Sequence, residues 1–207
     1  SRDWSSDVCS SDLERGLVPI LDVAYLGFGN GLVEDAASLR AFAATGCELL
    51  VASSASKNFA LYNERVGALA LVGATPAATK VLASHARMAV RTAWSNPPAH
   101  GGAIVSSILG DPASRAQWEG EVAAMRERIA ANRRDLVAAL AAAGLTDFER
   151  LLRHRGMFSL LGLSDAQLAR LREEHAIYLV AQGRINMAGL SASKAPIVAR
   201  AVAQVLA

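Results

Sequence analysis

The sequence predicts an α/β fold, in which a mostly parallel sheet alternates with helices, followed by a smaller α+β domain. Over the first hundred residues, short apolar runs rich in Val, Ile and Leu are separated by amphipathic stretches. Long helical patterns occupy the middle of the chain, and short strand-like runs mix with helices toward its end. With 207 residues, 52% of them hydrophobic, the chain can build one sizeable core or two modest ones.

Residues 1–13 are expected to lie outside this fold. The stretch DWSSDVCSSDL, residues 3–13, looks like the translation of a sequencing-adapter oligonucleotide. Read as ordinary protein, it is a Ser/Asp-rich segment with too few apolar residues to pack. We therefore expect homologous sequence to begin near Glu14 and the true N-terminal part to be missing. Cys9 falls in this tail, so Cys47 would be the only native cysteine.

The first expected element is a buried strand over residues 17–21 that delivers Asp22 at its carboxyl end. The GFGNG stretch at residues 27–31 lacks the strand-to-helix context of a phosphate-binding glycine motif, so we interpret it as a loop. The elements that follow are a helix over residues 34–44 and strands over residues 48–52 and 66–72.

Two helix starts are marked by a capping residue followed by proline. Thr75-Pro76 predicts a helix that runs toward Trp94. Asp111-Pro112 repeats the signal for a long helix that ends at Gly144. One face of that helix carries apolar residues at helical spacing: Trp118, Val122, Met125, Ile129, Leu136 and Leu140.

Such a long helix commonly links two domains, and we place the boundary within it, with a large domain over residues 14–125 and a small one over 126–207. In the small domain, Ser164 and Gln167 predict a capping box for a helix. Pro196 is expected to open the last helix. Strands are expected over residues 156–161, 177–180 and 185–187.

Composition argues against several classes of protein. The 21 basic and 19 acidic residues are spread along the helices, which gives no electrostatic reason to expect nucleic acid. The longest charge-free apolar stretch, residues 66–79, contains two glycines and a proline and is too short to cross a bilayer. The cysteines form no C-x-x-C pair, and the four histidines have no metal-ligand spacing. We expect a soluble cytoplasmic protein without metal or membrane partners.

Lys57 is the first candidate for chemistry. It lies in the sequence SSASKNF, after one expected strand and before another, among small hydroxyl residues. An amine in such a place is partly desolvated, which favours its neutral form as a nucleophile that can make a Schiff base. Taken alone, however, a lysine is more often a solvated surface charge.

Five segments in order change this balance. Residues 21–25, 51–59, 62–67, 95–101 and 183–188 together resemble the active-site blocks of class I (aspartate/aromatic) aminotransferases, which are fold type I pyridoxal-phosphate enzymes. The likeness covers nearly everything after Glu14. It implies the C-terminal half of such an enzyme: part of the cofactor-binding large domain and then the small domain.

The resemblance implies pyridoxal 5′-phosphate as cofactor and a role for each matching residue. Lys57 matches the lysine that holds the cofactor as a Schiff base and shuttles a proton in the 1,3-shift. Asp22 matches the carboxylate that faces the pyridine nitrogen. Tyr25 matches the phenol that bonds the 3′-oxygen. The phosphate would be held by Ser54, Arg65 and Ser56. Without the resemblance, Asp22 would be interpreted as a strand-end turn residue and Tyr25 as a half-buried packing residue.

The resemblance also implies substrate contacts. Arg184 matches the clamp on the substrate α-carboxylate, and Phe158 an aromatic near the substrate entrance, for which a core role is at least as plausible. Arg91 matches an arginine that reaches across a homodimer interface to the side-chain carboxylate of a dicarboxylic substrate. Aromatic aminotransferases retain it too, so Arg91 leaves the substrate open. Ala55 departs from the larger residue common in the family.

The expected function is therefore transamination between aspartate or an aromatic amino acid and 2-oxoglutarate by the parent enzyme, a homodimer. Two alternatives stay open. The chain could be a catalytically incompetent truncated fragment, because the N-terminal half would supply phosphate-binding amides, a ring stacked on the cofactor and part of the dimer interface. It could also be an aminotransferase-like effector-binding domain of a transcription regulator, which an upstream DNA-binding domain would indicate.

Overall fold

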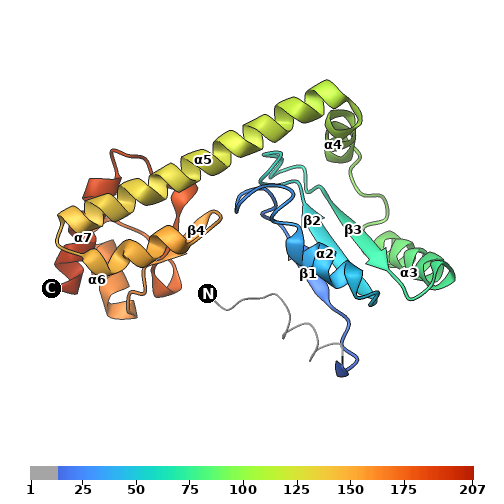
Figure 1. Ribbon diagram of the computed structural model, residues 1–207, viewed down its shortest axis with the longest axis horizontal. Helices are drawn as coiled ribbons and strands as arrows, with labels where there is room; N and C mark the ends of the chain where they lie inside the picture. The colour runs from blue at the N-terminus through green and yellow to red at the C-terminus, as the bar shows by residue number, and fades with distance from the viewer. Residues whose placement is uncertain (1–13) are drawn as a thin grey trace. The chain divides into compact units, whose positions relative to one another are not determined.

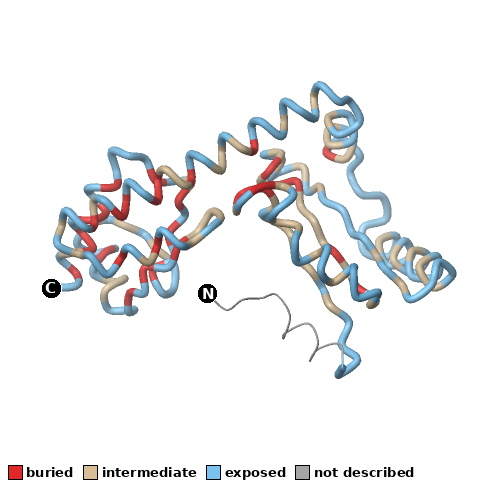
Figure 2. The backbone as a smooth tube through the Cα atoms, in the orientation of Figure 1, coloured by how far each residue is buried: buried red, intermediate tan, exposed pale blue. Residues whose placement is uncertain are grey.

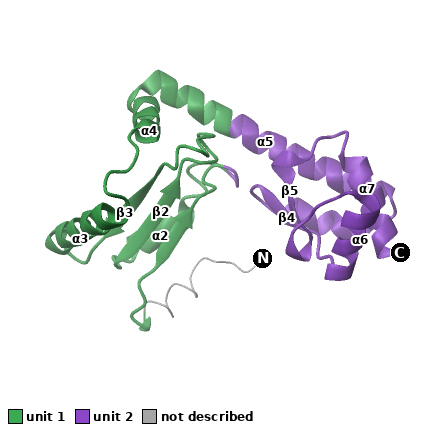
Figure 3. Ribbon diagram, turned by 180° about the vertical axis from the view of Figure 1, so that it is seen from behind, with its two compact units in different colours: residues 1–27, 31–122 green, residues 28–30, 123–207 purple. Residues whose placement is uncertain are grey.

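The computed structural model describes residues 14–207, so the adapter-like tail predicted over residues 1–13 lies outside the described residues. The described chain forms two compact units (Figure 3). Unit 1 comprises the residues up to Gly27 together with Gly31–Val122, and unit 2 comprises Phe28–Asn30 and Ala123–Ala207. Helix α5 (Pro112–Ala142) begins in unit 1 and ends in unit 2. Figure 1 labels the elements.

The sheet of unit 1 is mixed. Its strands are β1 (Ile20–Val23), β2 (Leu49–Ser54) and β3 (Gly67–Val72), in the order β1-β2-β3. β1 pairs with β2 in parallel, but β2 pairs with β3 antiparallel. The predicted mostly parallel sheet is therefore wrong for these strands. Residues 55–66 connect β2 to β3 without a crossover helix, and such a connection returns the chain antiparallel.

Three helices accompany this sheet: α2 (Ala37–Ala44) contacts β2, α3 (Pro76–Trp94) contacts β3, and α4 (His100–Gly110) follows. The predicted cap of α3 is confirmed, because Thr75 Oγ1 accepts the backbone N–H of Ala78 at 3.1 Å. The carboxylate of Asp111 likewise accepts the N–H of Ser114 at 2.8 Å, which lowers the pKa of Asp111. Helix α4 was not predicted, and α2 begins three residues later than expected.

Unit 1 buries little of its apolar surface (Figure 2). Neither α2 nor α3 contains a buried residue, and β3 is mostly exposed. The expectation of a buried strand at residues 17–21 is wrong in both place and burial. β1 lies slightly later, and as an edge strand it alternates exposed with half-buried residues. The buried apolar residues of unit 1 are Leu49, Val51, Ala55 and Val122.

Unit 2 combines the second part of α5 with a two-stranded antiparallel sheet and two further helices. The predicted capping box of Ser164 and Gln167 is confirmed at the start of α6. No strand forms at residues 177–180, where only Val180 makes an isolated bridge, because a 3-10 turn follows it at once. The elements are η1 (Thr146–Arg153), β4 (Phe158–Leu160), α6 (Asp165–His175), η2 (Ala181–Gly183), β5 (Arg184–Asn186), η3 (Met187–Gly189) and α7 (Ala195–Leu206).

One apolar core holds unit 2 together. It gathers side chains from α5, η1, α6 and α7, and the loop residue Phe28 belongs to it. Among its fully buried members are Leu136, Leu140, Leu151 and Val202. The loop predicted at residues 27–31 is confirmed, and it contributes Phe28 to this core. Within residues 14–207, every helix is too short or too polar to cross a membrane.

Candidate active site

The parallel pairing of β1 and β2 brings their carboxyl ends to the same edge of the sheet. Asp22 lies opposite Ala52, and Val23 opposite Ser53. The turn after β1 carries Tyr25, and the turn after β2 carries Ser56 and Lys57. Groups at the carboxyl ends of parallel strands converge, which is where open α/β sheets commonly bind ligands. One edge of the sheet in unit 1, which we call the Lys57 edge, therefore carries the predicted cofactor residues Asp22, Tyr25, Ser54, Ser56 and Lys57.

The ammonium of Lys57 contacts the ring of Tyr25. Its Nζ lies 4.7 Å from the ring centroid, within the range of a cation–π contact. Lys57 is half-buried, whereas Tyr25 is exposed over 41% of its surface. The aromatic ring therefore contacts the amine while part of the ring stays exposed.

Two hydroxyls form a hydrogen-bonded pair beside Lys57. Ser54 Oγ donates to Ser56 Oγ at 3.0 Å and accepts the backbone N–H of Ser56 at 3.1 Å. Arg65 has a positive φ of 51° and donates from Nη1 to the carbonyl of Tyr62 at 3.1 Å. Within the described chain, no hydrogen bond joins Arg65 to either serine. Hydroxyl and guanidinium groups are both chemically suited to a phosphate dianion.

The sequence predicted Asp22 at the end of a strand over residues 17–21, but in the structure Asp22 lies inside β1. Its Oδ1 accepts the N–H of Ala24 at 3.1 Å, which fixes the carboxylate at the start of the turn that leads to Tyr25. Asp22 is exposed, so the carboxylate is accessible to a cationic partner.

The turn that carries Lys57, called the Lys57 turn, is anchored by contacts of Asn58, Phe59 and Trp118. The sequence did not reveal this function. The indole Nε1 of Trp118 donates to the carbonyl of Asn58 at 2.8 Å, and its ring stacks on Phe59 with centroids 4.4 Å apart. The amide of Asn58 donates to the carbonyl of Leu26 at 3.3 Å. The turn that carries Lys57 is thus tied both to α5 and to the turn that carries Tyr25. Sequence spacing had placed Trp118 only on the apolar face of a helix.

Gly67, the first residue of β3, allows the backbone to approach the site closely. A Cβ built there would lie 2.3 Å from the carbonyl oxygen of Ser53, and Gly67 pairs with Ser54 in the sheet. No side chain fits at that distance. The glycine therefore sets how closely β3 supports the end of β2.

Arg91 lies on α3, exposed and held by the end of its own helix. Its Nη1 donates to Ser95 Oγ at 3.1 Å and to Asn96 Oδ1 at 3.0 Å. Ser95 has a positive φ of 61° and a ψ of −87°, which turns the chain sharply after the helix. The structure describes no contact between Arg91 and the Lys57 edge.

The two predicted substrate residues of unit 2 lie together. The guanidinium carbon of Arg184, on β5, is 5.1 Å from the ring centroid of Phe158, on the neighbouring strand β4. Both residues line a cavity of about 420 Å³. His154 lines it too, and its pKa is lowered by burial and by the charges of Arg150, Arg133 and Arg153. Because Arg155 and Arg184 also line it, the cavity is electropositive.

The class of protein is shown by the family model for aminotransferase class I and II, which matches residues 7–202. The chain belongs to this family. Its resemblance to class I enzymes of the aspartate and aromatic type is confirmed by individual relatives. It is 50% identical over 194 residues to an aromatic-amino-acid aminotransferase of Pseudomonas aeruginosa, covering 93% of this chain and 49% of the relative. An aspartate aminotransferase of Escherichia coli is 47% identical over 195 residues, covering 94% of this chain and 49% of that protein.

A solved structure gives the same result for the fold. The aromatic-amino-acid aminotransferase of Burkholderia pseudomallei, covalently bound to pyridoxal phosphate, matches with a TM-score of 0.92 and 47% identity. The match covers 97% of this chain and 50% of that one. The chain thus has the α/β aminotransferase fold, with one small mixed sheet and one two-stranded antiparallel sheet, and it spans about half the length of the relatives it matches.

Proposed function

We propose that this chain carries the lysine-bearing half of an aminotransferase site that uses pyridoxal 5′-phosphate to exchange an amino group between aspartate or an aromatic amino acid and 2-oxoglutarate. The observation that carries the proposal is the Lys57 amine on the Tyr25 ring, at the edge where the carboxyl ends of β1 and β2 meet. Family membership and the covalently bound cofactor of the Burkholderia relative support it. The complete enzyme would be a homodimer.

The residues at this edge fit the cofactor by their chemistry. The hydroxyls of Ser54 and Ser56 and the guanidinium of Arg65 would hold the phosphate. The Asp22 carboxylate would face the ring nitrogen and keep it protonated, while the Tyr25 phenol would donate to the 3′-oxygen. When bound, the cofactor supplies an electron sink for the negative charge left by the substrate α-proton.

Lys57 would perform two tasks. Its amine would hold the cofactor covalently and, once released, would carry the proton between the substrate α-carbon and the cofactor. The contact with Tyr25 and the anchoring of Asn58 by Trp118 would limit where the amine can move, which is what a proton carrier requires.

The substrate would be oriented by arginines. Arg184, stacked beside Phe158, would bind the α-carboxylate through two parallel hydrogen bonds. Arg91 would bind the side-chain carboxylate of aspartate or 2-oxoglutarate. Since Ser95 and Asn96 already accept hydrogen bonds from Arg91, such a carboxylate must replace two neutral acceptors with a charged one. This exchange favours dicarboxylates and leaves aromatic substrates free to enter.

The test uses the three lysines of the chain. Pyridoxal phosphate is added, the mixture is reduced with borohydride, and the labelled peptides are identified by mass spectrometry. Lys80 and Lys194 are exposed and serve as internal controls. We expect label chiefly on Lys57, a matching absorbance band that is lost in Lys57→Ala, and weaker labelling in Arg65→Gln.

Equal label on Lys57, Lys80 and Lys194 would contradict the proposal for this chain and favour the incompetent fragment. Selective label without any amino-group transfer from aspartate, phenylalanine or tyrosine to 2-oxoglutarate would show a binding site that lacks catalysis. That outcome would fit both the incompetent fragment and the effector-binding alternative, and an upstream DNA-binding domain would distinguish the second.

A further inference from the structure

Unit 2 contains a buried guanidinium that forms no ion pair with a carboxylate of residues 14–207. Arg133, on α5, is only 4% exposed. Its Nε donates to Ser159 Oγ at 3.1 Å, and its Nη2 donates to the carbonyl of Gly156. Both acceptors are neutral, so they fix the guanidinium without cancelling its charge. A buried charge normally has a partner of opposite sign, because desolvation is otherwise costly.

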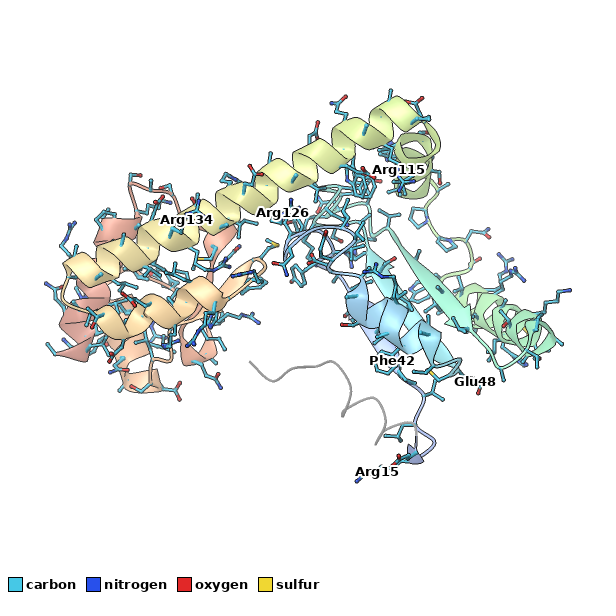
Figure 4. The ribbon with its side chains drawn as sticks, viewed as in Figure 1. Arg15, Phe42, Glu48, Arg115, Arg126 and Arg134 are labelled. Carbon is cyan, nitrogen blue, oxygen red and sulfur yellow. The ribbon has the colours of Figure 1, made fainter. Side chains whose placement is uncertain are left out.

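Arg133 lines a cavity of about 460 Å³ made only of residues of unit 2. Arg126, Arg134 and Arg155 line it as well, whereas Glu127 is its one acidic lining residue. Figure 4 marks Arg126 and Arg134 along α5. In the part of the chain that the structure describes, no ion pair joins Arg133, Arg134 or Arg155 to a carboxylate.

Neutral groups also hold Arg155. Its Nε donates to Asn30 Oδ1 at 3.1 Å, and its Nη1 donates to the carbonyls of Leu152 and His154 at 2.9 and 3.1 Å. The pKa of Arg133 is lowered by burial and by the charge of Arg155. The guanidiniums of Arg133 and Arg155 are therefore held in place by neutral acceptors before any ligand arrives.

We propose that this cavity binds a small oxyanion of the phosphate class. Guanidinium groups suit such an ion because their planar N–H forks donate to two oxygens at once and stay charged at every working pH. Nη1 of Arg133 has no hydrogen-bond partner among residues 14–207, so it keeps donors for the ligand. The lining shares no residue with the phosphate position proposed at Ser54 and Arg65, and the inference does not depend on that proposal.

The test is a titration of the isotope-labelled chain with inorganic phosphate, with sodium chloride keeping the ionic strength constant. The backbone amide resonances of Gly29 and Ala130, which line the cavity, report binding. Arg134→Gln should weaken phosphate binding about tenfold, the value of one charge-assisted hydrogen bond. Glu127→Gln should tighten binding, because it removes the one negative charge. Glu127 and Arg134 are both exposed, so their substitution should leave the fold intact.

Control variants separate this site from the others. Arg128→Gln changes an exposed arginine of the same helix that does not line the cavity, and it should leave the affinity unchanged. Arg65→Gln and Arg184→Gln remove the two other candidate anion positions and should leave the Gly29 and Ala130 response intact. The proposal is overturned by an absence of saturable shifts, by equal affinities in Arg134→Gln and Arg128→Gln, or by loss of the response in Arg65→Gln.

Discussion

In unit 2, helices α5, α6 and α7 share one apolar core, whereas in unit 1 helices α2 and α3 have no buried residue at all. Unit 1 relies instead on strand pairing, on the few buried residues around β2 and on the Trp118 contacts. Burial of apolar surface is the dominant favourable term in folding. The candidate cofactor edge therefore lies in the unit that buries less apolar surface, and a ligand that binds only the folded state would stabilise it.

The largest expected difference between the units comes from truncating an apolar side chain in each. Leu140→Ala in unit 2 removes a fully buried side chain and should cost about 2–5 kcal/mol. Leu69→Ala in β3 is the matched control, since Leu69 is 55% exposed and should cost less than about 0.5 kcal/mol. Urea unfolding, followed by hydrogen exchange for each unit, measures both. Similar losses would mean that the two units do not differ as described.

A second prediction concerns the contact that anchors the Lys57 turn. Trp118→Phe keeps a ring against Phe59 but removes the hydrogen bond to the Asn58 carbonyl, which should cost unit 1 about 1–2 kcal/mol. Selective labelling of Lys57 by pyridoxal phosphate should fall as well. Trp94→Phe is the control, because Trp94 is 69% exposed. If both variants label Lys57 alike, Trp118 does not position the turn.

Helix caps should give a smaller effect that differs in extent between the units. Thr75→Ala and Ser164→Ala each remove one accepted N–H and should cost about 1 kcal/mol. Because α3 has no buried side chains, loss of the Thr75 cap should fray several of its turns, whereas α6 is held by the core through Leu171. Amide exchange along each helix tests this, and equally local fraying in both would refute it.

The smallest effect concerns pH in unit 2. The pKa of His154 lies below its ordinary 6.5, because of burial and the charges of Arg150, Arg133 and Arg153. As the pH falls below 6.5, the unfolded chain takes up this proton before the folded chain does, so stability decreases with acidification until the folded pKa is passed. His154→Gln should flatten this part of the pH profile. An unchanged slope between the two chains would assign the pH dependence to other groups.

Sequence patterns predicted the features that depend on neighbours along the chain. The caps of α3, α5 and α6 follow from a few adjacent residues, and the five aminotransferase segments identified the family. Features that depend on distant contacts were missed or misjudged. The antiparallel pairing of β3 and the hydrogen bond from Trp118 to Asn58 join residues that no local pattern relates. The exposure of β1 likewise depends on which distant segments pack against it. The roles of the site residues remain predictions.

Gly67 has a consequence for engineering. The carbonyl of Ser53 occupies the space that a methyl group would need, so even alanine at position 67 must push the end of β2, and Ser54 with it, away from its present course. In a library of variants made to alter substrate choice, this position should be kept fixed while Arg91, Ser95 and Asn96 are varied. A deep mutational scan should show a sharp intolerance at Gly67, because the Ser53 carbonyl leaves no room for a side chain there.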